Sequence, residues 1–102
     1  MLRQVARLSA GWSGWADLAN QTKRAASSVL LNIAEGAGCK PGSGMRRRSY
    51  EIARGSAYEV AAALDAAAGM ELSPLAEIAE VQREAGRLCT LLAALIGSEA
   101  AR

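Results

Sequence analysis

Cationic side chains are the groups in this sequence best suited to chemistry with an anion. Forked guanidinium groups bind phosphate oxygens in pairs, and the positive end of a helix dipole does not favour cations, so an arginine run at a helix start indicates an anionic partner. The candidate nucleic-acid-binding residues are six cations in the first half of the chain: Lys23, Arg24, Lys40, Arg46, Arg47 and Arg48. The alternative is that the arginine run is only a solvated, solubilising end of the protein.

A second candidate cluster consists of polar residues that interrupt otherwise apolar segments: Asn32, Glu35, Arg54, Ser56 and Glu59. Antiparallel pairing of the two segments would bring them together. Because buried charges persist only when they are paired, Arg54 with Glu35 or Glu59 is predicted to form a structural clasp. The alternative is acid–base catalysis by two carboxylates, but no nucleophile or metal-ligand set accompanies them.

The composition argues against most enzymes. Histidine is absent, which removes the usual general base and the commonest metal ligand. The glycine-rich residues 36–44 contain no Gly-Lys-Ser/Thr triplet for a phosphate loop, and Pro41 occupies the third glycine position of a dinucleotide motif. The chain is therefore predicted to be non-enzymatic, with no cofactor and no metal site.

Helices must position these residues. Alanine, the best helix former, accounts for 23 of 102 residues, whereas the strand-forming Val, Ile and Thr are sparse. Small or apolar residues recur at steps of three and four over about residues 15–35, 43–68 and 74–96, and a shorter stripe precedes them. Gly36 is predicted to end the first long helix. The predicted fold is all-α, an antiparallel up-down four-helix bundle with a short first helix, forming one domain over residues 1–102.

The last predicted helix carries two apolar rows. One row has heptad spacing: Ile78, Val81, Ala85, Leu88, Leu92 and Leu95. The second row contains Cys89, Ala93 and Ile96, with Leu91 beside it. Since a lone bundle of this size would expose part of the second row, we predict a homo-oligomer. The alternative is that the N-terminal helix covers this row.

Charge is distributed unevenly along the chain. Residues 1–54 carry nine Lys/Arg and three Asp/Glu, for a net +6, whereas residues 55–102 carry three and seven, for a net −4. Such asymmetry is typical of a protein that binds RNA or DNA electrostatically, without sequence specificity. It is also compatible with a protein–protein interaction scaffold in which the basic end meets an acidic partner or the chain's own acidic C-terminal half.

The sequence also indicates a compartment. Arg3, Gln4 and Arg7 interrupt the first apolar segment, unlike the apolar core of a secretory signal, and no apolar stretch reaches the roughly 20 residues that span a bilayer. Cys39 lies in the glycine-rich segment and Cys89 in an apolar helical run. We predict a soluble, cytoplasmic protein with reduced cysteines and no membrane association, and leave a disulfide open.

Two strings within these segments carry a family resemblance. They are Asn32-Ile33-Ala34-Glu35-Gly36 and Ile52-Ala53-Arg54-Gly55-Ser56. In this order and separation they resemble a bacterial four-helix-bundle family. That family includes the proteins encoded in intervening sequences of 23S ribosomal RNA genes and the accessory variability proteins of diversity-generating retroelements.

The resemblance implies an antiparallel four-helix bundle and, in related members, a pentamer with a positively charged surface. For the retroelement branch it also implies binding to a reverse transcriptase and nucleic acid. Arg46 and Ser49 stand where the family usually carries aromatic residues, which predicts weaker packing near the glycine-rich segment.

Overall fold

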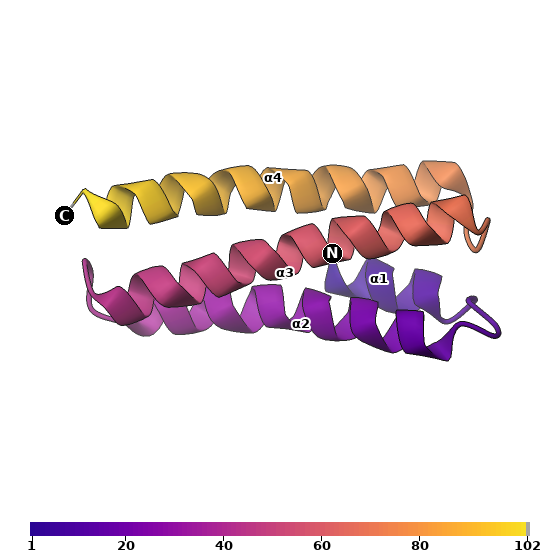
Figure 1. Ribbon diagram of the computed structural model, residues 1–102, viewed down its shortest axis with the longest axis horizontal. Coiled ribbons are helices and arrows are strands. Elements are labelled where there is room, and N and C mark those ends of the chain that lie inside the picture. Colours follow the sequence, from indigo (N-terminus) through magenta and orange to yellow (C-terminus); the bar gives the residue numbers. More distant parts are fainter. Residues whose placement is uncertain (102) are drawn as a thin grey trace.

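The computed structural model describes residues 1–101, which form four α-helices joined by short loops (Figure 1). The helices are α1 (Leu2–Ser9), α2 (Ala16–Gly38), α3 (Gly44–Gly69) and α4 (Leu75–Ala100). No strand occurs among the described residues. The predicted all-α fold with a short first helix is confirmed.

The helices form a rod of 45 × 20 × 17 Å. α3 packs against both α2 and α4, and α1 packs along α2. Figure 1 shows that α1 reaches only about half the length of the rod, so the N-terminus lies near its middle. The loop between α2 and α3 and the end of α4 lie together at one end of the rod, which we call the α2–α3 end (Figure 1).

The core is built from small side chains with a few larger ones between them. Buried alanines occur on α2, α3 and α4, and they allow helix axes to approach closely. The largest fully buried side chains are Leu64, Ile78 and Leu92. Val5 on α1 and Trp12 in the following loop complete the core at the end opposite the α2–α3 end. The few large side chains therefore supply much of the apolar burial that holds the rod together.

The buried face of α4 differs from the predicted heptad row. Cys89 is buried in place of Leu88, which is only partly buried, and Leu95 is 39% exposed. A straight helix has 3.6 residues per turn, so a strict seven-residue repeat drifts off one face unless the helices supercoil. After Ala85 the observed row therefore runs through Cys89, Leu92 and Ile96, so that Leu92 keeps its predicted place while Cys89 and Ile96 replace Leu88 and Leu95.

As a result, the second apolar row of α4 is largely internal. Cys89 packs against Val29 and Ala57, and Ile96 packs beside Leu92. The row was predicted to be exposed in part, and these two residues belong to the part that is covered, because α3 packs over them. Ala93 and Leu91 are exposed, as expected. Most of the large apolar side chains that are exposed lie outside this row. They include Leu30, Leu31, Met45, Tyr58 and Leu75.

Candidate nucleic-acid interface

The exposed cations of the arginine run lie at the start of α3. Ser43 caps this helix, since its Oγ accepts a hydrogen bond of 3.1 Å from the Arg46 backbone N–H. Successive residues of a helix point about 100° apart, so the three arginines diverge. Arg47 and Arg48 are exposed, and Arg47 Nε lies 4.0 Å from Glu51 Oε1 in a half-exposed pair. Both guanidinium groups are accessible to an anion from solution.

Arg46 points inward instead. Its Nε lies 3.0 Å from Oε1 of Glu99 on α4, and the two side chains are 18% and 3% exposed. The Nε–H is not aligned with that oxygen, so this contact is Coulombic rather than a well-formed hydrogen bond. Nη1 donates to the Cys39 carbonyl at 3.2 Å, and the guanidinium lies 5.6 Å from the Tyr50 ring centre. Arg46 therefore joins the loop, α3 and α4.

Glu99 completes this contact from the last turn of α4. Its Oε2 accepts a hydrogen bond of 2.6 Å from the Gly42 backbone N–H. The sequence analysis missed Glu99. The spacing of α4 could have identified it. The buried row of this helix continues in steps of four and three from Leu92 through Ile96 to Glu99, which places the Glu99 carboxylate on the buried face. A carboxylate in that position requires a cationic partner, and Arg46 is that partner.

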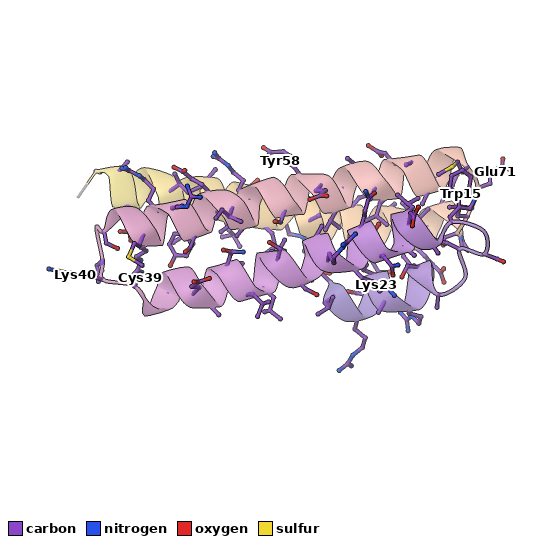
Figure 2. The ribbon with its side chains drawn as sticks, turned by 60° about the horizontal axis from the view of Figure 1, so that its bottom comes forward. Trp15, Lys23, Cys39, Lys40, Tyr58 and Glu71 are labelled. Carbon is purple, nitrogen blue, oxygen red and sulfur yellow. The ribbon has the colours of Figure 1, made fainter. Side chains whose placement is uncertain are left out.

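The remaining candidate cations form two separate patches. Lys40 lies in the α2–α3 loop beside the start of α3, and Figure 2 shows it projecting from the tip of the rod. Lys23 projects from α2 well away from that tip, and its neighbour Arg24 is also exposed (Figure 2). Seventeen positions at 1.5 Å each separate Lys23 from Lys40 by roughly 25 Å along the rod. We name Lys40 with Arg47 and Arg48 the end patch.

Part of the predicted polar cluster does come together between α2 and α3. Ser56 Oγ donates to Ser28 Oγ at 2.8 Å, and Asn32 Nδ2 donates to the same hydroxyl at 3.1 Å and to the Ser28 carbonyl at 2.9 Å. The cluster ties the two helices by polar contacts in a partly buried position. Ser28 is its centre, although the sequence analysis did not select it.

The charged members of the predicted cluster do not pair. Glu35 and Glu59 are exposed, and neither carboxylate forms an ion pair with Arg54 in the described structure. The expected clasp is therefore wrong. The reason is exposure, because a solvated carboxylate needs no protein partner. The buried ion pair of the bundle forms at the α2–α3 end, between Arg46 and Glu99.

Gly36 lies inside α2, which continues to Gly38, so its predicted role as a helix end is wrong. Its position is explained by Tyr50 on α3, whose ring is 3% exposed. A Cβ at residue 36 would lie 2.6 Å from Tyr50 Cε1 and 2.8 Å from Cδ1. The missing side chain makes space for the ring. Tyr50 therefore supplies an aromatic contact near the loop, where Arg46 and Ser49 had predicted weak packing.

The two cysteines are free thiols. Cys39 Sγ donates to the Glu35 carbonyl at 3.2 Å. Burial raises the pKa of the Cys89 thiol, and the positive charge of Arg54 opposes this only in part. Since a thiol with a raised pKa stays protonated at neutral pH, Cys89 is a packing residue and not a nucleophile.

An apolar hollow of about 660 Å³ opens between α2 and α4 beside the N-terminus. Leu30, Ile33 and Leu88 line it together with residues of α1, and the N-terminal amino group lies 3.1 Å from Glu84 at its edge. Leu91 follows Leu88 on α4 by three residues and is 61% exposed. The hollow exists because α1 begins only about halfway along the rod (Figure 1), so α2 and α4 have no fourth helix between them beyond that point.

Neither a metal site nor a membrane-spanning helix is found in residues 1–101. No group of three or more Cys, Asp or Glu side chains lies close enough to hold a metal ion. None of the four helices is both long enough and apolar enough to cross a bilayer.

Comparison with known proteins gives one match. The family described as 23S rRNA-intervening sequence protein matches residues 5–94, which include most of α1, all of α2 and α3 and most of α4. No curated protein and no solved structure matches the chain.

Proposed function

The chain belongs to the 23S rRNA-intervening sequence protein family, and from this premise we propose that it is a non-enzymatic, homo-oligomeric bundle that binds RNA or DNA electrostatically. The observation that carries the proposal is the end patch. Lys40 projects from the tip of the rod (Figure 2), and Arg47 and Arg48 are exposed near the start of α3, which follows the same loop. Lys23 and Arg24 provide a second contact on α2. Arg46 is not included, because Glu99 neutralises it.

The binding is expected to be independent of nucleotide sequence. Phosphate neutralisation releases counterions, so affinity depends steeply on salt, whereas sequence readout of single strands needs hydrogen bonds to the edges of bases that aromatic rings hold by stacking. Trp12 is buried and donates through Nε1 to Ser73 Oγ at 2.8 Å, and Tyr50 is buried against Gly36. Neither ring is available for stacking on a base. The exposed rings, Trp15 and Tyr58, lie away from Lys40, at the opposite end of the rod and midway along it (Figure 2).

The double variant Arg47→Ala/Arg48→Ala tests the end patch. We expect it to bind single-stranded RNA about tenfold more weakly at low salt and to reduce the slope of log K against log salt concentration by about 1.4, because two phosphate contacts are lost. Fluorescence anisotropy over a salt series measures both quantities.

The matched control is Arg83→Ala/Arg87→Ala, which removes two exposed arginines from α4 and changes the net charge equally. It should alter affinity and slope much less than the end-patch variant. Equal losses in the two variants would show that only net charge matters, and unchanged binding in Arg47→Ala/Arg48→Ala would remove the end patch from the proposal.

Self-association is supported by the apolar hollow and the exposed leucines near it. Leu30 and Leu91 are both more than half exposed, and apolar strips of this kind commonly mark interfaces. We propose that copies of the chain associate through this side of the rod, and the family resemblance suggests five subunits. Leu91→Glu would then place a charge in the interface.

Leu91→Glu is expected to reduce the mass measured by light scattering from that of an oligomer to that of one chain. Leu75→Glu is the control, because Leu75 is 69% exposed at the opposite end of α4. A wild-type mass of a single chain, or an oligomer that Leu91→Glu leaves intact, would contradict this interface.

The same exposed leucines favour a second candidate function, a scaffold that binds another protein and has no role with nucleic acid. Nuclease treatment distinguishes the two candidate functions. A protein partner stays bound to the chain after nuclease has removed nucleic acid, whereas a nucleic-acid partner does not. A reverse transcriptase is such a partner only if the chain belongs to the retroelement branch. The end patch is the observation that favours nucleic acid over this alternative.

A further inference from the structure

The Glu99 carboxylate is held in the way that a protein holds a bound anion. Its two oxygens meet different donor groups: Oε1 lies 3.0 Å from Arg46 Nε, and Oε2 accepts the Gly42 N–H at 2.6 Å. A backbone N–H and a guanidinium are also the donors that proteins use for phosphate. Gly42 and Arg46 together form an anion site that a side chain of the same protein fills.

The filling group comes from a distant and terminal part of the chain. Glu99 is 57 residues from Gly42 and lies in the last turn of α4, which ends at Ala100. A last helical turn opens more readily than the interior of a helix, because its carbonyl groups lack partners within the helix. The carboxylate can therefore leave the anion site without unfolding the bundle.

The anion site lies within the end patch. Lys40 precedes Gly42 by two residues, and Arg47 and Arg48 directly follow Arg46. While Glu99 is in place, its charge cancels that of Arg46 and covers the Gly42 N–H. When it leaves, a fourth cation and a backbone donor become available beside the exposed ones.

We propose that Glu99 is an intramolecular competitor of nucleic-acid phosphate: the last turn of α4 occupies the Gly42–Arg46 anion site, and phosphate binding at the end patch displaces it. This inference rests on the proposed function and adds a means of control to the same surface. The protein with Glu99 in place binds nucleic acid weakly at its tip, and the protein with Glu99 displaced binds it more tightly.

The test compares Glu99→Ala with Glu51→Ala. Both variants remove one carboxylate from the same end of the rod, but the half-exposed Glu51 meets only Arg47 and does not fill the anion site. We expect Glu99→Ala to bind single-stranded RNA about threefold or more tighter than Glu51→Ala at low salt, with a salt slope steeper by about 0.7, the contribution of one further phosphate. Equal gains in the two variants would overturn the proposal.

A second measurement uses inorganic phosphate and no RNA. The Gly42 amide resonance should shift in a saturable way on addition of phosphate to Glu99→Ala, but not to the wild type or Glu51→Ala. Absence of that shift in Glu99→Ala overturns the inference, whatever RNA does. If the shift occurs and RNA binds none of the proteins, Glu99 still competes with phosphate for the Gly42–Arg46 anion site, but the proposed function fails and nucleic acid is not the competing anion.

Circular dichroism should show that the variants keep their helical content. If Glu99→Ala does not fold, Glu99→Gln replaces it, because glutamine keeps the shape of the side chain and removes its charge. The Gly42 amide of Glu99→Gln should then respond to phosphate at concentrations that leave the wild type unchanged. An identical response in Glu99→Gln and the wild type would overturn the proposal.

Discussion

Gly36→Ala is expected to lower the free energy of unfolding by about 2 kcal/mol, although alanine is the better helix former. The added Cβ would lie 2.6 Å from Tyr50 Cε1 and 3.3 Å from Ser49 Cβ, so α2 and α3 would have to separate or the buried ring would have to leave its place. Overpacking of this kind costs roughly 1–3 kcal/mol, and loss of ring burial adds to it. Urea unfolding followed by circular dichroism measures the change.

Two other helical glycines provide a control of opposite sign. A Cβ at Gly55 or Gly86 would meet nothing within 4 Å, so alanine there should raise the free energy of unfolding by up to about 1 kcal/mol. Tyr50→Ala should also make Gly36→Ala less harmful, since the clash is then gone. Stabilisation by Gly36→Ala itself, or strictly additive effects of Gly36→Ala and Tyr50→Ala, would show that this close approach is not real.

Leu64→Ala is expected to cost about 3–4 kcal/mol, near the middle of the range for buried leucines. Leu64 is fully buried in the main core, where Ala67 and Ala85 are among the residues of the same cluster. Alanine side chains cannot change rotamer to fill a cavity, so most of the vacated volume stays empty. Because small domains have a total stability of about 5–15 kcal/mol, the variant should unfold at much lower urea concentration or temperature.

Leu75→Ala makes the same chemical change at a site that is 69% exposed. It should change the free energy of unfolding by no more than about 0.5 kcal/mol. A cost below about 1 kcal/mol for Leu64→Ala would mean that the helices close around the vacated space, and that the alanine-rich core is less rigid than the structure indicates.

The helices themselves could be predicted closely from the sequence. The predicted segments 15–35, 43–68 and 74–96 correspond to α2, α3 and α4, which begin one residue later in each case and end one to four residues later. Helix propensity and the 3.6-residue period act within a few residues of the chain, so a single sequence contains them. Gly36 was misplaced because a glycine required by a neighbouring helix looks, in sequence, like a glycine that ends its own helix.

The candidate site was predicted in part. Lys40, Arg47 and Arg48 are exposed together at one end of the rod, but Arg46 belongs to the same run and is neutralised by Glu99. The partners of this ion pair are 53 residues apart in the chain, so no local pattern connects them. The uneven charge of the two halves indicates only that some basic residues of the first half are neutralised by acidic residues of the second. It does not indicate which residues pair.

The sequence by itself determined the four helices, their order and the approximate places of the loops between them, because these follow from propensity, periodicity and chain-breaking residues that act locally. Only the tertiary structure decided how α4 is rotated, why residue 36 has no side chain, and which arginine stays in solvent. The first two outcomes depend on which atoms come into van der Waals contact when segments far apart in the chain pack together. The third depends on whether a charged side chain stays in water or is buried with a partner of opposite charge.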